Sequence, residues 1–257
     1  MKVNGKYIIN IPIAKVFKYP DKRSNLETEF LFGESIKIID QKSNWVFCEN
    51  LIDQYQGWIE KDVLGNYLET THYVNKLNSI VFSKPHIKSF PLFNLTYNSK
   101  VLVNYSEKNW SEICLDNGKN KGYVPEKHLS RDFNLPEATI SNSKYFLNVP
   151  YLWGGKSYQG IDCSGFIQLI HQTSGKYLPR DSNDQMQYCK KYKQLDNIKK
   201  GALIFWNGHV ALAIDKENII HANAFHMNVA IENFLEAKNR ISKNYGNILN
   251  ICQEYEI

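Results

Sequence analysis

The sequence has no run of apolar residues approaching the roughly 20 that a membrane-spanning helix needs, so an integral membrane protein is not expected. It also has no block of Lys and Arg of the kind that phosphate binding favours. Its 31 basic residues exceed its 26 acidic residues by five over 257 positions, so nucleic acid is not an expected partner either. With 43% hydrophobic and 22% charged residues, the composition excludes a disordered or fibrous chain.

Cysteine pairs are missing as well. None of the five cysteines forms a CxxC motif, and an odd, scattered set argues against both a zinc site and a disulfide framework. Reduced thiols fit a reducing compartment. The first residues, MKVNGKYIINIPIAKVF, lack the architecture of a secretory signal because Asn10 and Pro12 interrupt a short apolar run. We therefore expect a cytoplasmic protein with no metal and no cofactor.

A repeat occupies the first half of the chain. The segments KSNWVFCENLIDQYQGWIEKDVL and EKNWSEICLDNGKNKGYVPEKHL each place a tryptophan, Trp45 or Trp110, twelve residues before a glycine, Gly57 or Gly122. An aromatic residue, a β-branched residue, a Glu-Lys pair and a leucine follow each glycine. The two segments are therefore copies of one unit, offset by 65 residues.

Each copy has the pattern of short strands. β-Branched and aromatic residues gather in stretches such as Ser35–Ile39 and Lys100–Asn104, with polar turns between the stretches. Units of this size built from short strands favour small antiparallel barrels. The large aromatic side chains are interpreted as packing in the barrel core or at its rim. They are Trp45, Trp58, Trp110 and Tyr123.

The pattern changes from about Ser141 onward. A glycine-punctuated loop leads into the run DCSG, and apolar residues then recur at helical spacing. Further on, strand-like segments return on both sides of a polar turn, so this part is expected to be an α+β domain. The expected elements are helices over 143–148, 166–175 and 180–188, and strands over 201–214 and 219–223.

Cys163 is the first candidate for chemistry because it lies where the glycine-rich loop becomes a helix. The amides of the first helical turn favour the thiolate, which is the nucleophilic form of cysteine. Asp162 and Ser164 keep the site polar. A lone cysteine is more often structural, so the interpretation depends on a partner.

His209 supplies that partner. It shares one face of its strand with Ala211 and Ala213, whose small side chains are expected to leave room above the imidazole. His221 lies twelve residues further on, and the even separation across a hairpin puts both imidazoles on one face. His221 would then hold His209 in the tautomer that accepts the thiol proton. A zinc ion on Cys163 and the two histidines is the alternative, which the lack of a fourth clustered ligand disfavours.

These residues resemble the NlpC-type (NlpC/P60) family of bacterial cell-wall peptidases. The resemblance rests on the runs PYLWGGKSYQGIDCSGFIQ, RDSNDQ, GALIFWNGHVALAI and IIHANA, which follow one another in the family's order and spacing over residues 141–224. It implies an α+β papain-like catalytic domain over 136–257, preceded by two all-β SH3-like barrels over 1–70 and 71–135. It also implies that Cys163 is the nucleophile, His209 the base and His221 the third member of the catalytic set.

The resemblance is to the dipeptide-releasing branch of this family. Members of this branch cleave the bond between γ-D-glutamate and the diamino acid of peptidoglycan stem peptides, and they require a free N-terminal L-alanine. We therefore expect a monomeric cysteine peptidase that releases L-Ala-γ-D-Glu from a small peptide in murein peptide recycling. The sequence leaves open whether the diamino acid is diaminopimelate or lysine.

Further residues are assigned by the resemblance. Tyr151 would complete the oxyanion hole with the backbone amide of Cys163. The ammonium group of the substrate needs carboxylate or phenol oxygens to accept its protons. Helix capping is an alternative role for Asp181 and Ser182. The implied substrate contacts are Trp153, Asp162, Ser164, Asp181, Ser182 and Gly208, together with Tyr55 and Glu29 of the first barrel, with Glu27 as a competitor of Glu29.

Two functions of other classes remain as alternatives. The first is a catalytically idle module that only binds cell-wall peptide. The second is a thiol acyltransferase or amidase on the same papain-like core, for which an extended apolar groove would be the favourable sign.

Overall fold

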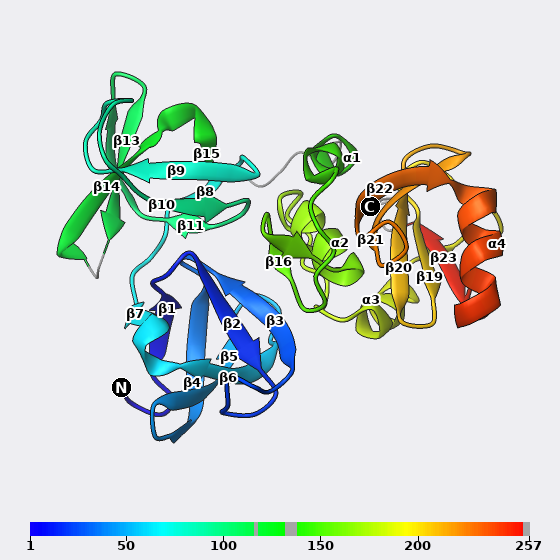
Figure 1. The fold of residues 1–257 in the computed structure, drawn as a ribbon, viewed down its shortest axis with the longest axis horizontal. Helices are drawn as coiled ribbons and strands as arrows, with labels where there is room; N and C mark the ends of the chain where they lie inside the picture. Colours follow the sequence, from blue (N-terminus) through cyan, green and yellow to red (C-terminus); the bar gives the residue numbers. More distant parts are fainter. Residues whose placement is uncertain (116–117, 132–137, 254–257) are drawn as a thin grey trace. The chain divides into compact units, whose positions relative to one another are not determined.

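The computed structural model describes residues 1–115, 118–131 and 138–253, and it divides into two compact units (Figure 1). Unit 1 comprises Met1–Phe133 together with Lys156–Tyr158, and unit 2 comprises Asn134–Gly155 and Gln159–Ile257. The domain boundary expected between residues 135 and 136 lies outside the described residues. Among the helices that the structure describes, none has the length and apolar content needed to cross a bilayer.

The first half of unit 1 is one seven-stranded antiparallel sheet in the order β3-β2-β6-β5-β4-β1-β7. Its inward side chains form a closed apolar cluster that includes Val16, Phe30, Ile38 and Ile59. A 3-10 turn over Lys61–Val63 leads into the last strand. The strands are β1 Lys6–Ile9, β2 Ile13–Phe17, β3 Leu26–Leu31, β4 Ser35–Lys42, β5 Trp45–Asn50, β6 Gln56–Glu60 and β7 Leu64–Asn66.

The second half of unit 1 has a five-stranded sheet, β10-β9-β14-β13-β12, and a three-stranded sheet, β11-β8-β15. Both are antiparallel, and their core includes Val81, Leu95, Ile113 and Val124. The strands are β8 His72–Val74, β9 Asn78–Phe82, β10 Pro91–Thr96, β11 Lys100–Val101, β12 Val103–Glu107, β13 Trp110–Leu115, β14 Asn120–Pro125 and β15 Leu129–Ser130.

The expected repeat is confirmed at the level of individual contacts. A Cβ atom added to Gly57 would lie 2.4 Å from Val16 Cγ1, and one added to Gly122 would lie 2.4 Å from Val81 Cγ1. The two valines are themselves 65 positions apart, so each copy needs glycine where a strand crosses closely over the equivalent side chain. Large aromatic rings pack alike in both copies, with ring centroids 5.6 Å apart for Phe17 and Trp45 and 5.4 Å apart for Phe82 and Trp110.

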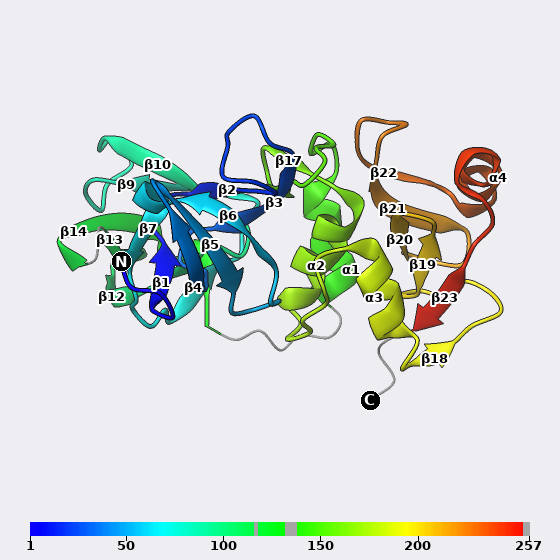
Figure 2. The same ribbon diagram turned by 90° about the horizontal axis from the view of Figure 1, so that it is seen from below.

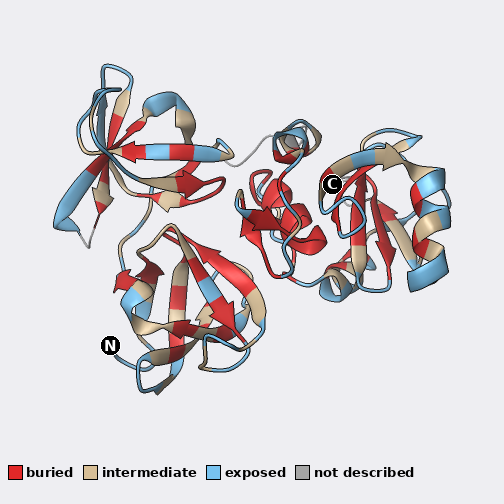
Figure 3. Ribbon diagram, in the orientation of Figure 1, coloured by how far each residue is buried: buried red, intermediate tan, exposed pale blue. Residues whose placement is uncertain are grey.

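Unit 2 is built on an antiparallel sheet in the order β18-β23-β19-β20-β21-β22. Helices α2 and α3 lie on one side of this sheet and α4 lies on the other (Figures 1 and 2). Helix α2 and the central strands are the most deeply buried elements (Figure 3). The strands are β17 Gly160–Ile161, β18 Lys193–Gln194, β19 Leu203–Trp206, β20 His209–Ala213, β21 Asn218–Asn223, β22 Asn228–Asn233 and β23 Asn250–Gln253, and the helices are α1 Ala138–Ser143, α2 Cys163–Gln172, α3 Ser182–Cys189 and α4 Phe234–Tyr245.

Two expected elements of unit 2 are corrected. The segment 201–214 is a hairpin rather than one strand, because β19 pairs with β20 through Trp206 and His209 and leaves Asn207 and Gly208 as the turn. Gly208 takes a left-handed φ of 69°, which favours glycine. The helix expected over 143–148 begins earlier, as α1, and continues only as a 3-10 turn over Lys144–Phe146, since the chain reverses at Asn148 with a φ of 67°.

The space above Ala211 and Ala213 is filled, contrary to expectation. Ala237 and Ile241 of α4 pack against both alanines in one apolar cluster. The small side chains of this strand face therefore allow α4 to pack closely against it. The cavity lies at the His209 end of the face.

Lys156 lies in β16 (Lys156–Ser157), whose residues belong to unit 1 although they are flanked in sequence by unit 2. Its Nζ donates to both carboxylate oxygens of Glu34, at 2.9 and 3.2 Å, and Asn50 Nδ2 donates to the same carboxylate at 2.7 Å. The side chains of Lys156 and Glu34 are 1% and 0% exposed. Both charges have therefore lost almost all of their contact with water, and each is stabilised mainly by the other.

Replacing Lys156 with Met should lower the melting temperature of the protein. Removal of one partner of a buried ion pair leaves the other charge uncompensated, which costs on the order of 3–5 kcal/mol. The matched control is the double variant Lys156→Met/Glu34→Gln, which should recover much of the loss. Differential scanning fluorimetry of both variants checks this, and an unchanged melting temperature for the single variant would contradict it.

Candidate active site

Cys163 is the first residue of α2 and is 5% exposed. Its Sγ lies 4.0 Å from the carbonyl oxygen of Gly208, and the backbone amide of Val210 hydrogen-bonds to the sulfur. The sulfur therefore packs against the backbone on both sides of His209. This is the approach between helix start and strand start that the sequence predicted.

His209 and His221 are in direct contact. The register of β20 and β21 pairs Ala213 with Ile219, which puts both histidines on one face, and His209 Nε2 lies 2.7 Å from His221 Nδ1. His221 Nε2 in turn lies 2.6 Å from Glu232 Oε1 on β22. A chain of hydrogen bonds thus runs from Glu232 through His221 to His209.

The direction of this chain follows from its carboxylate end. Burial alone would raise the pKa of Glu232, but the hydrogen bond from His221 and the charge of Arg240 outweigh it and lower that pKa, so the group is an ionised acceptor. Nε2 of His221 must then donate to Glu232, which leaves Nδ1 of His221 to accept from Nε2 of His209. His209 therefore carries its lone pair on Nδ1, and nothing in the described parts of the chain hydrogen-bonds to that nitrogen. This is the state that a general base requires.

Burial sets the protonation of the thiol and the imidazoles. It raises the pKa of Cys163 to about 12, aided by the charge of Asp162, and outweighs the amides of Val210 and Ser164. The amides of the helix start do favour the thiolate, as expected, but burial has the larger effect on the thiol. Burial also lowers the pKa of His209 well below its ordinary value, as do His221 and Arg240. The resting site pairs a neutral thiol with a neutral imidazole.

Tyr151 is fixed beside this group by its backbone. Its amide donates to Met227 O at 2.9 Å, and it forms a parallel bridge with Ile161, two residues before Cys163. Burial, Cys163 and Asp162 raise the pKa of the Tyr151 phenol. The hydroxyl therefore keeps its proton and can donate it in a hydrogen bond.

A cavity of about 310 Å³ opens beside the two histidines. Predicted site residues that line it include Tyr151, Trp153 and Gly208. Trp153 is 70% exposed, so its ring is available to a ligand. Phe225, Arg240 and Tyr245, which the sequence did not single out, line the same cavity.

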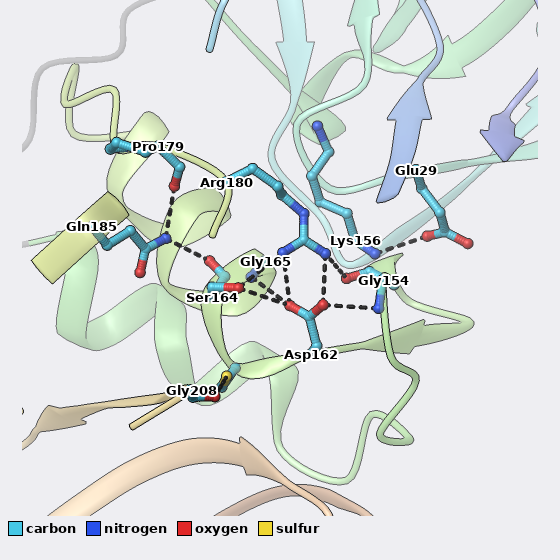
Figure 4. Close-up of polar contacts among 12 residues, drawn as sticks. Glu29, Gly154, Lys156, Asp162, Ser164, Gly165, Pro179, Arg180, Gln185 and Gly208 are labelled. Carbon is cyan, nitrogen blue, oxygen red and sulfur yellow. Dashed lines mark hydrogen bonds and ion pairs between the residues drawn. The ribbon is translucent and has the colours of Figure 1, made fainter. Parts of the chain in front are cut away.

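Asp162 has a structural role that the sequence did not predict. Its carboxylate accepts from the amides of Gly154 (2.9 Å) and Gly165 (2.7 Å) and pairs with both terminal nitrogens of Arg180, at 2.9 and 2.7 Å (Figure 4). Ser164 Oγ donates to the same carboxylate at 3.3 Å and accepts from Arg180 at 2.9 Å. Both oxygens of Asp162 are thus engaged within the protein.

Asp181 and Ser182 lie at the start of α3, where Asp181 is the N-cap residue. The Asp181 side chain is exposed and makes no capping hydrogen bond, so capping by this carboxylate is not observed. Helix α3 is instead tied to α2 by Gln185, whose Nε2 donates to the carbonyl oxygens of Ser164 at 3.0 Å and Pro179 at 2.9 Å (Figure 4).

The predicted barrel residues lie in unit 1. Glu29 is 2% exposed, faces Lys15 across the β2–β3 pair, and accepts from the backbone amide of Lys156 at 2.8 Å. Tyr55 lies in the loop before β6, half-buried against the first-barrel core, and its amide donates to Asp53 at 3.0 Å. Their assignment to substrate binding stays a prediction.

Three charged residues of the site were missed from the sequence: Arg180, Glu232 and Arg240. Glu232 could have been found, because the strand after His221 returns antiparallel and pairs Glu232 with Ile219, which lies on the same face of β21 as His221. Arg180 and Arg240 carry no such signal. Within the described residues, no group of three or more His, Cys, Asp or Glu side chains is arranged to hold a metal ion.

Replacing Asp162 with Asn should destabilise the protein and inactivate its site together. The change leaves the guanidinium of Arg180, 1% exposed, without its charge partner, at a cost on the order of 3–5 kcal/mol. Asp181→Asn is the matched control, since that carboxylate is exposed and should not affect stability. Thermal melts of both variants check this, and equal melting temperatures would count against the structural role of Asp162.

The comparisons with known proteins agree with this architecture. Residues 148–244 match the NlpC/P60 family, and residues 16–64 match the bacterial dipeptidyl-peptidase SH3 domain. Dipeptidyl-peptidase 6 of Lysinibacillus sphaericus is 27% identical over 238 residues, covering 84% of this chain and 87% of that protein. The γ-D-glutamyl-L-lysine dipeptidyl-peptidase of Bacillus cereus is 29% identical over 229 residues, covering 77% of this chain and 68% of that protein.

A solved structure shares the whole fold. The crystal structure of an NlpC/P60 family protein from Bacillus cereus superimposes with a TM-score of 0.82 at 23% identity, over 98% of this chain and 99% of that one. The expected fold class is confirmed. The chain therefore carries an NlpC/P60 domain with a papain-like α+β fold, preceded by a bacterial dipeptidyl-peptidase SH3 domain, and this combination identifies it as a peptidase.

Proposed function

We propose that the protein is a cysteine peptidase that cleaves the bond between γ-D-glutamate and a diamino acid in free peptidoglycan stem peptides, releasing L-Ala-γ-D-Glu. The observation that carries this proposal is the hydrogen-bonded series Glu232–His221–His209 ending beside the thiol of Cys163. The name of the Bacillus cereus relative, a γ-D-glutamyl-L-lysine dipeptidyl-peptidase, supports the choice of bond.

In the proposed reaction, Nδ1 of His209 takes the proton of Cys163 as the sulfur attacks the γ-carbonyl carbon of D-glutamate. The Tyr151 hydroxyl and the Cys163 amide hold the oxyanion, where one such donor is typically worth about 10²–10³ in kcat. His209 then gives its proton to the leaving amine as the C–N bond breaks. Water, deprotonated by His209, attacks the thioester, and the sulfur leaves with the proton restored.

Glu232 stabilises the imidazolium that forms during both steps. Its carboxylate raises the pKa of His221 against the effect of burial. His221 in turn orients the His209 ring through the hydrogen bond between the two imidazoles. The resting pair is neutral, so charge separation develops only as substrate binds and reacts. This places the electrostatic stabilisation in the transition state rather than in the resting enzyme.

Recognition of the substrate ammonium is assigned to Asp181 rather than Asp162. Asp181 is exposed at the start of α3, where a ligand can reach its carboxylate, whereas Asp162 is buried and bonded to Arg180 and to backbone amides. A carboxylate in this position would favour peptides whose alanine amine is free. Such peptides have already been released from glycan, so we propose a role in murein peptide recycling, by a cytoplasmic monomer.

Purified protein should cleave L-Ala-γ-D-Glu-diaminopimelate and leave its N-acetylated copy intact. Acetylation removes the charge that a carboxylate would bind, so kcat/KM should fall by at least about tenfold. Mass spectrometry of the products measures both reactions. Cys163→Ala should bind the free peptide without cleaving it. If the unaltered protein also binds but does not cleave, an idle binding module is the better description, and equal cleavage of both peptides would remove the amine requirement.

The pH dependence of kcat/KM should reflect the buried histidines. Since burial lowers the pKa of His209 and of His221, both are still neutral at pH 6.5 and gain a proton only at lower pH, so the acid limb of the profile should lie below 6.5. Cys163 should add no limb near neutrality because its pKa is about 12. On the alkaline side, activity should decline near pH 8, where the substrate amine loses its proton. An acid limb at or above pH 6.5 would contradict this assignment.

A further inference from the structure

The cavity beside the catalytic histidines carries one fixed charge. Its lining, which lies wholly in the described part of unit 2, includes no Asp, Glu or Lys side chain, and Arg240 is its only arginine. His209 and His221 contribute no charge at rest, because burial lowers the pKa of both. The charged group that this wall presents to a ligand is therefore the guanidinium of Arg240, and no carboxylate lines the cavity.

Arg240 is held in place but keeps hydrogen-bonding capacity. It lies on α4, its guanidinium stacks over the ring of Phe225 at 4.2 Å, and its Nη2 pairs with Glu232 Oε1. The side chain is 25% exposed. A guanidinium has five N–H donors, and a single nitrogen is used by Glu232, so the other edge can take a carboxylate with two hydrogen bonds.

The position of the cavity indicates which part of the substrate enters it. In the proposed reaction His209 hands a proton to the leaving nitrogen, so the group attached to that nitrogen must lie against His209. His209 lines the cavity, whereas Asp181, to which the alanine ammonium is assigned above, does not. The cavity is thus on the side of the diamino acid. Its volume, about 310 Å³, is at the lower end of the range for small-molecule sites.

We propose that Arg240 binds the side-chain carboxylate of the leaving diamino acid, so that the protein prefers diaminopimelate to lysine. This inference rests on the proposed function and decides a question that the sequence leaves open. The side chain of lysine ends in an ammonium group alone, which would approach the like charge of Arg240 and find no carboxylate on the cavity wall. The side chain of diaminopimelate ends in an amine and a carboxylate.

Other polar groups of the cavity can bind the ammonium group of the diaminopimelate side chain. Asn244 and Tyr245, on the same helix as Arg240, carry oxygens that can accept from an ammonium group. Tyr245 is 56% exposed, so the ammonium group can stay partly hydrated. Only the carboxylate then needs to be taken out of water, and it gains a charge-assisted partner.

The first test uses the unaltered full chain and three tripeptides that differ at one residue. L-Ala-γ-D-Glu is followed by diaminopimelate, by diaminopimelate whose side-chain carboxylate is an amide, or by lysine. We expect kcat/KM for the first to exceed the other two by on the order of 10-fold to 100-fold, as befits a charge-assisted bidentate contact. Equal values for the acid and its amide would overturn the role of Arg240.

The second test separates specificity from catalysis. Arg240→Met should reduce the preference for diaminopimelate over lysine to nearly one, and Arg240→Lys should keep part of it. Because Arg240 also contacts Glu232, both variants can lose kcat, but a loss in the histidine series lowers cleavage of all three peptides alike. The ratio of kcat/KM values is therefore the readout, and a ratio unchanged in Arg240→Met would overturn the proposal.

A binding measurement keeps this test distinct from the proposed function. Isothermal titration calorimetry should detect free diaminopimelate binding to the unaltered protein more tightly than free lysine, with the difference lost in Arg240→Met. If none of the three peptides is cleaved while this difference in binding is present, the proposed reaction is wrong and the subsite stands. If the peptides are cleaved and the two amino acids bind alike, the subsite is wrong and the reaction stands.

Discussion

The arrangement of the site depends on the ion pair between Asp162 and Arg180. One carboxylate bonds the amide of Gly154 in the glycine loop, caps α2 through Gly165, and holds the guanidinium that precedes α3. Cys163 is the next residue after Asp162, so its Cα position is set by all three contacts at once. The position of the nucleophile therefore depends on its backbone neighbours, whereas the neutral state of its thiol follows from burial.

Burial and hydrogen bonding act in opposite directions on the catalytic groups. Burial favours the neutral form of both Cys163 and His209. Glu232 acts in the opposite direction, because its carboxylate favours a positive charge on the imidazole of His221. The balance leaves an uncharged site that is already oriented for proton transfer. The catalytic pair gains electrostatic stabilisation only as the sulfur loses its proton.

Much of this could be predicted from the sequence, because the informative patterns are local. The even spacing of His209 and His221 fixed their common face, and the Trp-to-Gly spacing fixed the repeat, whose glycines each lie against a valine. Three points could not be predicted. The space above Ala211 is filled by α4, which is distant in sequence, and the pKa of Cys163 follows burial that a helix start does not reveal. The partner of Asp162 is an arginine eighteen residues away with no periodic relation to it.

Two arginine–carboxylate pairs described in unit 2, Arg180–Asp162 and Arg240–Glu232, have different roles although the same groups form them. Arg180 is 1% exposed and uses both terminal nitrogens on Asp162, so its charge is fully compensated inside the protein. Arg240 is 25% exposed, and its partner Glu232 also accepts from His221. Part of the Arg240 guanidinium therefore stays accessible, and its field extends into the cavity that it lines. Exposure, rather than residue type, decides which of these two guanidinium groups can still bind a ligand.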